Sequence, residues 1–390
     1  MMRVLLAHNY YREPGGEDQV FESEAALLAE RGHAVVRYVV NNREIHRAGP
    51  VAALQATWNR RVSAEVGALI EQARPDVLHC HNFFARLSPA VYYAAAAHGI
   101  PVVQTLHNYR LLCLNATLFR DGRVCEDCVG RAVPWPGVLH ACYRASRPAS
   151  AAVALLLSAH RAVRTWAKRV HVYVALTSFA RQKLIAGGVP ADRIVVKPNF
   201  VDPDPGPGNG RGEYALFVGR LSAEKGIDTL LRAWRLLQGR PPLLIVGDGP
   251  LAPVVAEAAR SIVGCRWLGS RPRQEVLELM RGARLLVVPS RWYEGFPMVI
   301  AEAYATGVPV VASDLGSLGC LVHDKRTGLR FRAGDPDDLA SKVEWLDVHP
   351  EERQDMTAAA RGEFEANYSP DQGYRNLVAI YRLAIERCRA

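Results

Sequence analysis

Two glutamates stand eight positions apart in a segment that could bind a hydroxyl-rich, anionic ligand. Glu294 lies in a loop after an apolar run, and Glu302 lies in a helix that we predict from Met298 to Ala305. Pro297 pre-sets the first helical turn, and N–H groups at a helix start lack partners within the helix, so they can bind an anion or a hydroxyl. Glu302 can accept two hydrogen bonds from a vicinal diol such as ribose. Solvated acids on a helix are the alternative interpretation.

A second segment supplies positive charge. Arg220 and Lys225 lie in the loop between an apolar run that ends at Val218 and the helix that follows. Arg offers a planar fork and Lys a point charge, and beside a helix start the two suit a diphosphate. An exposed Glu224-Lys225 turn is the alternative.

Histidines end two predicted strands in the first half of the chain. His107 follows the strand at Pro101–Leu106, and His79 and His81 lie at the end of the strand at Asp76–Cys80. Imidazoles can act as acids or bases near neutral pH, although a lone histidine at a strand end is more often structural. We therefore expect a functional role for His107 first and for His81 second.

A glycine pair follows the first predicted strand. Gly15 and Gly16 have no side chain, so a ligand could approach the backbone closely at the start of the next helix. A plain turn and helix cap is the alternative.

Four of the eight cysteines lie close together in the sequence: Cys113, Cys125, Cys128 and Cys142. The Cys-x2-Cys spacing is typical of structural zinc sites, and the flanking cysteines could complete a tetrahedron, with His140 as a further candidate. A reduced thiol cluster, or bridges formed only on oxidation, is the alternative. We expect this insertion, residues 109–145, to contribute to a binding pocket.

Short aliphatic runs that alternate with helical patterns indicate an α/β protein of parallel sheets covered by helices on both faces. A length of 390 residues favours two domains, and the three Pro and four Gly of residues 202–213 predict a linker. We expect domains at residues 1–201 and 214–372, with a last helix at 374–390 packing back on the first. The expected strands are 3–7, 34–40, 76–80, 101–106, 172–177, 194–197, 215–218, 243–246, 267–268, 285–289 and 308–312.

The excess positive charge lies in the first half: residues 1–200 hold 24 Lys and Arg against 14 Asp and Glu. Such a half suits a phosphorylated ligand or an anionic membrane, and without a nucleic-acid motif we expect no nucleic acid. Residues 144–171 predict a basic amphipathic helix that could rest on a membrane, with a solvated face as the alternative. With neither a long apolar run nor a leader-like start, we expect a cytoplasmic protein, one that could be peripheral on the inner face of the membrane.

Four motifs together carry a family resemblance. They are EGFPMVIAE at 294–302, GRLSAEKG at 219–226, VGDGP at 246–250 and PNFVD at 198–202. In this order they resemble the nucleotide-sugar half of the retaining glycosyltransferases of family 4, which have the GT-B fold. The resemblance is strong from residue 214 to 335 and looser before it. It implies two facing doubly wound domains with a cleft between them, the first for the acceptor and the second for the donor.

The resemblance also implies a role for each matching residue. The donor diphosphate would be held by Arg220 and Lys225, the ribose by Glu302, and the transferred sugar by Glu294. The remaining donor contacts would come from Gly15, Gly16, Asn199, Ser270, Arg271, Gly295, Phe296, Pro297 and Met298. His107 matches the family's active-site histidine.

The implied reaction is retaining transfer of a sugar from a UDP- or GDP-sugar to an acceptor hydroxyl without an essential metal. The acceptor would be a glycan, a lipid-linked glycan or a polysaccharide precursor. Two alternatives stay open: a nucleotide-sugar epimerase of the same fold, and a non-catalytic protein that binds nucleotide sugars.

Overall fold

The computed structural model describes residues 1–11, 15–44, 49–208 and 212–389, except the side chains of Glu44 and Pro50. The chain forms two compact units. Unit 1 holds Met1–Leu118, Glu126–Pro198 and Gly373–Ala390, and unit 2 holds Phe119–Cys125 and Asn199–Gln372. Part of the expected linker, residues 209–211, lies outside the described residues, as does the last residue of the chain.

Unit 1 contains a parallel sheet of six described strands in the order β2-β1-β3-β4-β7-β8. Its central strands are fully buried because both faces are covered, and they are accordingly aliphatic. The strands are β1 (Arg3–Tyr10), β2 (Ala34–Asn41), β3 (Val77–Cys80), β4 (Val102–Leu106), β7 (Val172–Ala175) and β8 (Ile194–Val196).

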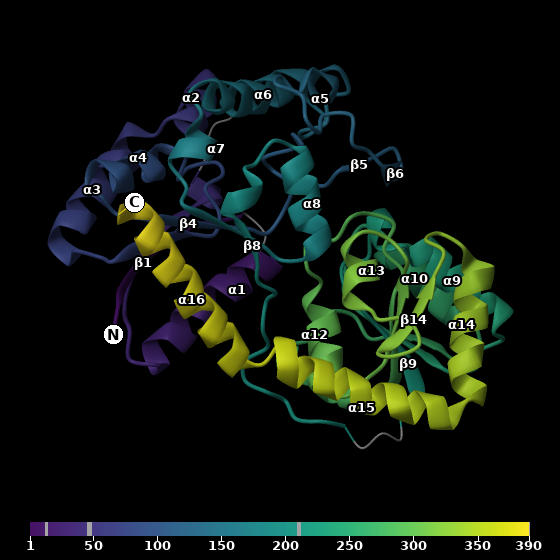
Figure 1. Ribbon diagram of the computed structural model, residues 1–390. Coiled ribbons are helices and arrows are strands. Elements are labelled where there is room, and N and C mark those ends of the chain that lie inside the picture. The colour runs from purple at the N-terminus through teal and green to yellow at the C-terminus, as the bar shows by residue number, and fades with distance from the viewer. Residues whose placement is uncertain (12–14, 45–48, 209–211, 390) are drawn as a thin grey trace. The chain divides into compact units, whose positions relative to one another are not determined.

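The helices of unit 1 follow the strands along the chain (Figure 1). They are α1 (Gly16–Glu30), η1 (Asn42–Glu44), α2 (Pro50–Thr57), α3 (Arg60–Ala73), α4 (Ala90–Ala97), α5 (Trp135–Leu139), α6 (Arg147–Ala162), α7 (Thr165–Lys168), α8 (Ser178–Ala186), η2 (Ala191–Arg193) and α16 (Pro370–Arg389).

The C-terminal helix α16 packs on the sheet of unit 1. Leu377, Ile380, Tyr381 and Ala384 lie in one core cluster with residues of β1, β3, β4 and β7. Their spacing places them on one face of a helix, and this apolar stripe buries α16 against the first half of the chain.

Unit 2 repeats the architecture with a parallel sheet whose described strands run in the order β11-β10-β9-β12-β13-β14. A separate hairpin of β5 (Phe119–Arg120) and β6 (Arg123–Val124) was not predicted from the sequence, and neither was β14. The sheet strands are β9 (Tyr214–Val218), β10 (Leu243–Val246), β11 (Cys265–Trp267), β12 (Ala283–Val288), β13 (Val310–Ser313) and β14 (Gly328–Phe331).

Helices cover this second sheet as well. They are η3 (Ala223–Lys225), α9 (Ile227–Leu236), α10 (Ala252–Ser261), α11 (Arg273–Arg281), α12 (Met298–Ala305), α13 (Ser317–Leu321), α14 (Pro336–Val348) and α15 (Pro350–Asn367). The predicted fold class, two doubly wound parallel α/β sheets, is therefore confirmed in each unit.

The continuous basic helix predicted for residues 144–171 is wrong. Helix α6 ends at Ala162, and Arg164 has a left-handed backbone with φ of +56° before the short helix α7 begins. Arg161 donates hydrogen bonds to the backbone carbonyls of Leu111 and Arg131. Arg161, a basic residue of the expected membrane-facing helix, thus holds loops of unit 1 together.

Candidate functional site

Each sheet reverses its strand order at one place, and open α/β sheets bind ligands at such places. In unit 1 the chain leaves β1 for β2 on one side and returns to β3 on the other, so this switch point lies between β1 and β3. In unit 2 it lies between β9 and β12 for the same reason. The loops after these strands carry most of the side chains that the sequence singled out.

The switch point of unit 2 brings Lys225 and Glu294 together. Lys225 Nζ lies 2.7 Å from Glu294 Oε1, and the hydroxyl of Ser290 donates to the same oxygen at 2.6 Å. Lys225 follows β9 and Glu294 follows β12, and these two strands are neighbours in the sheet. The pairing of the strands therefore joins two motifs that lie about seventy residues apart in the chain.

The glycines of two motifs allow the loops to pack this closely. Gly226 has φ of +72°, and a Cβ added there would lie 1.9 Å from the carbonyl oxygen of Pro289. Gly247 has φ of +138°, and its Cβ would lie 1.9 Å from the carbonyl oxygen of Gly219. Only glycine fits either position, so the GRLSAEKG and VGDGP motifs fix the shape of this edge of the sheet.

Glu294 is held as a carboxylate. Burial acts to raise its pKa, since only 4% of the residue is exposed, but the Lys225 ammonium and the Ser290 hydroxyl lower the pKa of Glu294 below its usual value. The Lys225 ammonium also lies 5.4 Å from the centre of the Trp292 ring. A positive charge fixed at a strand end in this way can meet an anionic ligand.

Glu302 is paired within unit 2 as well. Arg273 donates to Glu302 at 3.2 Å and to the carbonyl of Asp202 at 3.0 Å. Burial raises the pKa of Glu302, and Arg273 opposes this effect. Helix α12 begins at Met298 with Pro297 as its N-cap, so Pro297 sits one position before the predicted first turn.

The other residues expected around the donor are spread over unit 2. Arg220 is exposed in the loop after β9, and Ser270 and Arg271 are exposed after β11, where Arg271 lies 3.5 Å from Glu275. Asn199 is buried, and its side-chain oxygen has no hydrogen-bond partner within the described chain. The segment of Gly295 and Phe296 leads from Glu294 into α12, as the sequence predicts.

In unit 1, His107 is the end of a chain of polar contacts. His107 Nε2 lies 3.1 Å from His81 Nδ1, and the two rings are stacked with centres 5.3 Å apart. His81 Nε2 lies 3.3 Å from Glu24, and the other oxygen of Glu24 accepts from Lys197 at 2.6 Å. The switch point of unit 1 therefore has an ordered carboxylate–imidazole–imidazole arrangement.

Burial and nearby charges shift the pKa values of His107 and Glu24 in this chain. Burial lowers the pKa of His107 well below its usual value, while Lys197 and His81 hold the pKa of Glu24 well below its own despite burial. The contact between His81 Nδ1 and His107 Nε2 needs a proton on one of these two nitrogens.

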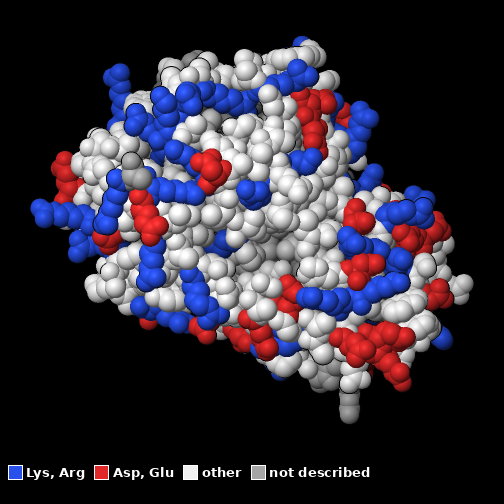
Figure 2. Space-filling model, in the orientation of Figure 1, with Lys and Arg blue, Asp and Glu red and all other residues white. Residues whose placement is uncertain are grey.

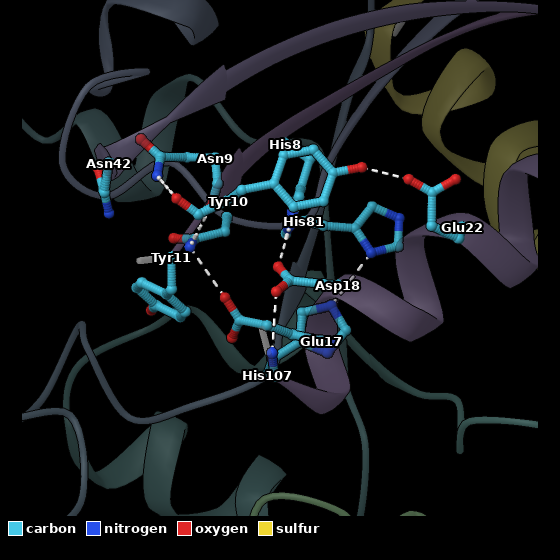
Figure 3. A network of polar contacts seen from close by, with 12 residues as sticks. His8, Asn9, Tyr10, Tyr11, Glu17, Asp18, Glu22, Asn42, His81 and His107 are labelled. Carbon is cyan, nitrogen blue, oxygen red and sulfur yellow. Dashed lines mark hydrogen bonds and ion pairs between the residues drawn. The ribbon is translucent and has the colours of Figure 1, made fainter. Parts of the chain in front are cut away.

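Glu17 is a functional candidate that the sequence analysis missed. It accepts hydrogen bonds from Asn82 at 2.9 Å and Asn108 at 3.2 Å, and beside it Asp18 lies 2.7 Å from His8 (Figure 3). Burial raises the pKa of Glu17 to about 8. A carboxyl group with so high a pKa at a strand-end cluster is characteristic of functional sites. The signal in the sequence was the GGED segment, which was interpreted through its glycines alone.

Gly15 and Gly16 begin α1 beside this cluster. Gly15 is the N-cap of the helix, and its N–H donates to Asp18 at 2.9 Å. No described atom lies within 4 Å of the Cβ that either glycine lacks, so packing within the described chain does not demand glycine there. Their role in donor binding stays a prediction.

One group in the described part of the chain has three metal-ligand side chains within reach of one another: Glu24, His79 and His81. Both ring nitrogens of His79 already form hydrogen bonds, Nδ1 with the hydroxyl of Tyr381 at 2.9 Å and Nε2 with that of Thr105 at 2.8 Å. Glu24 accepts a hydrogen bond from Lys197. Protein partners satisfy only part of this group, because Glu24 Oε2 and His81 Nε2 lie 3.3 Å apart and neither atom has a hydrogen-bond partner among the described residues.

The four cysteines are not gathered in the same way. Within the described residues, Cys113, Cys128 and Cys142 lie in unit 1 but form no such group, and Cys125 is assigned to unit 2. Zinc binding by these cysteines stays a prediction, which metal analysis of protein purified without chelators tests. One zinc per chain would support it.

The two doubly wound α/β units place the chain in the class of two-domain Rossmann-like proteins. One switch point carries a Lys–Glu pair and the other a chain of histidines. Known families agree with this. A model described as Glycosyltransferase Family 4 matches residues 14–205, and one described as Glycosyl transferases group 1 matches residues 212–347. The chain belongs to the group 1 glycosyltransferases of family 4.

Individual relatives match over smaller parts. The D-inositol 3-phosphate glycosyltransferase of Rhodococcus erythropolis is 33% identical over 44% of this chain and 42% of its own length. The glycogen synthase of Mycobacterium tuberculosis is 33% identical over 39% of this chain and 38% of its own. The matches thus span less than half the length of these curated relatives.

A solved structure covers nearly the whole chain. Anabaena Alr3699/HepE in complex with UDP has a TM-score of 0.71 at 15% identity, over 96% of this chain and 98% of its own. The same protein was also solved with UDP-glucose, with a TM-score of 0.66 at 16% identity over 99% of both chains. At such identity the likeness shows the GT-B fold.

Proposed function

We propose that this protein transfers a sugar, with retention of configuration, from a nucleoside diphosphate sugar to an acceptor hydroxyl. The observation that carries the proposal is the Lys225–Glu294 pair at the switch point of unit 2, with Arg220 in the same loop. Family membership supports the reaction type, and the complexes of the Anabaena protein with UDP and UDP-glucose favour UDP over GDP as the donor nucleotide.

The proposed work of unit 2 is to stabilise the leaving group. Positive charge develops on the sugar ring as the diphosphate departs, and the cations Arg220 and Lys225 lower the energy of that state more than the energy of the bound donor. In this proposal they supply the charge that a divalent metal would otherwise bring. Glu294 binds hydroxyls of the transferred sugar, and Glu302 binds the ribose.

The proposed work of unit 1 is to bind the acceptor. His107 and Glu17 offer polar groups for hydrogen bonds at the switch point, and a neutral His107 avoids repelling the positive charge that develops on the sugar. The departing phosphate takes the proton of the acceptor hydroxyl, so no covalent nucleophile is required. The acceptor class that we propose is a glycan, a lipid-linked glycan or a polysaccharide precursor, and the glycogen synthase named above supports a glycan.

We also propose that the protein works on the cytoplasmic side of the cell membrane as a peripheral protein. The excess of Lys and Arg in residues 1–200 supports an anionic surface as partner. In the described part of the chain, every helix is too short or too polar to span a bilayer.

Calorimetric titration with UDP and GDP tests the donor site. We expect one nucleotide to bind wild-type protein and to lose most of its affinity in Lys225→Ala, with Arg260→Ala as the control because Arg260 is exposed and pairs with the exposed Glu257 of its own helix. Equal affinity in wild type and Lys225→Ala would overturn the assignment. Product analysis then separates transfer from epimerisation, and slow donor hydrolysis without an acceptor excludes a protein that only binds.

A further inference from the structure

Unit 1 contains a cavity of about 450 Å³ between helices α2 and α6, a volume typical of small-ligand pockets. Its walls are made mainly of small apolar side chains. Those that matter for the argument are Ala52 and Ala56 on α2, Ala149 and Ala152 on α6, and Phe84 after β3. A cavity with alanine walls admits a slender apolar group.

The charge around the cavity is positive. Arg144 is the one charged side chain among the described residues that line it, and both Arg144 and Arg110 lie 5.3 Å from the ring of Tyr143, another wall residue. Residues 128–191, which include α5, α6 and α7, hold nine Lys and Arg and no Asp or Glu. An apolar cavity with a cation in its wall complements a hydrocarbon chain that carries an anionic group.

The cavity adjoins the polar cluster at the switch point of unit 1. The N–H of Phe84 donates to the side-chain oxygen of Asn82 at 2.9 Å, and the Asn82 amide donates to Glu17 at 2.9 Å. Arg110, whose guanidinium lies 4.3 Å from the centre of the Phe84 ring, is two residues beyond Asn108, the second partner of Glu17. A ligand held in the cavity by its chain would thus begin beside the groups that we assign to the acceptor.

The helices around the cavity also expose apolar side chains. Eight of the fifteen large hydrophobic residues that are exposed in the described chain lie on or next to α2, α5 and α6: Val51, Leu54, Trp58, Val133, Trp135, Leu139, Leu155 and Val163. Figure 2 shows Lys and Arg in a band along the upper edge, where Figure 1 places α6, with uncharged atoms between them. Apolar side chains among cations are typical of a surface that meets an anionic membrane.

We propose that the α2–α6 cavity binds the hydrocarbon chain of a lipid-linked acceptor, with Arg144 beside the lipid phosphate and the acceptor sugar toward Glu17. This inference rests on the proposed transfer function and names its acceptor class. It also accounts for a cavity that the donor chemistry of unit 2 does not use.

Calorimetry with farnesyl phosphate, a soluble lipid phosphate with one chain, tests the proposal on the full chain. We expect binding to wild type and to Ala151→Trp, and a loss of at least tenfold in Ala152→Trp. Ala152 lines the cavity, whereas its neighbour Ala151 is exposed and does not, so the same substitution is compared on one helix. Ala52→Phe fills the same cavity from α2 and should also lose binding. A loss in both variants would then not be explained by a folding defect in Ala152→Trp alone.

Two further arms identify the ligand and separate the two proposals. Arg144→Ala should weaken farnesyl phosphate several-fold while leaving farnesol unchanged, because only the phosphate is lost as a partner. If short-chain phosphatidylglycerol binds as tightly as farnesyl phosphate, the ligand is a membrane lipid and the acceptor assignment is wrong. If farnesyl phosphate binds equally to Ala151→Trp and Ala152→Trp, the cavity is not the binding site. UDP affinity should be the same in all these variants, so its loss would mark a failure of the donor site instead.

Discussion

The two switch-point clusters differ in how far their partners lie apart in the chain and in how much charge they leave to a ligand. In unit 2, Lys225 and Glu294 belong to two short motifs after neighbouring strands, and Lys225 keeps about a quarter of its side chain exposed. In unit 1, Glu24 is fully buried and pairs with Lys197 across 173 residues, while His79 meets Tyr381 across 302. The first cluster is available to an incoming anion, and the second pairs its buried carboxylate with a buried lysine of the same unit.

We expect the largest effect at Lys197, because a buried charge that loses its partner lowers the free energy of unfolding strongly. Lys197→Met leaves the Glu24 carboxylate buried without its cation, and we expect the free energy of unfolding to fall by about 3–5 kcal/mol. Urea unfolding of the full chain measures this change. Lys183→Met removes a lysine whose partner Glu126 is partly exposed, so it should cost under about 1 kcal/mol. Equal losses in the two variants would contradict the contrast.

The second prediction concerns pH, because Glu17 carries its raised pKa only in the folded protein. With a folded pKa of about 8 against an ordinary value of 4.5, the folded state binds more protons between these two values, so wild-type stability falls as the pH rises through this window. The Glu17→Gln variant has no titrating proton at this position. Relative to wild type, its free energy of unfolding should therefore rise by something on the order of 4 kcal/mol across the window.

Unfolding curves of both proteins across that range measure the difference. Two histidines act in the opposite direction, since the lowered pKa values of His79 and His107 remove stability as the pH falls below 6.5. They are present in both proteins and cancel. A difference that stays constant with pH would show that Glu17 titrates normally.

In unit 2 we expect a substitution in the Lys225–Glu294 cluster to change turnover. Lys225→Ala should lower kcat/KM on the order of 10²-fold, because a preorganised cation at the leaving group stabilises the transition state more than the bound donor. Initial rates with the donor identified by calorimetry measure this, with Arg260→Ala as the unaffected control. Normal rates in Lys225→Ala and in Arg220→Ala would remove the leaving-group role from both.

The same contrast explains what could be predicted from the sequence. Most strand positions, the start of α12 at Met298 and the two charged motifs of unit 2 depend on local spacing, and these were found within a few residues, whereas β5, β6 and β14 were missed. The chain Glu24–His81–His107 was not found, because the acid lies in the middle of a helix and nothing near it in sequence reveals Lys197. The break of the basic helix at Arg164 was also missed, and the carbonyls that accept hydrogen bonds from Arg161 lie 30 and 50 residues away in the chain.

The smallest effect that we predict tests whether Glu302 binds ribose. Glu302→Gln keeps the shape of the side chain but replaces a charged hydrogen-bond acceptor with a neutral one, so UDP affinity should fall roughly tenfold. The sharper measurement compares UDP with 2′-deoxy-UDP. Wild type should prefer UDP, and Glu302→Gln should lose most of that preference, whereas Glu278→Gln on the exposed face of α11 should keep it. If Glu302→Gln weakens both nucleotides equally, Glu302 acts through its partner Arg273, and the cluster of unit 2 then resembles that of unit 1 more than its exposure suggests.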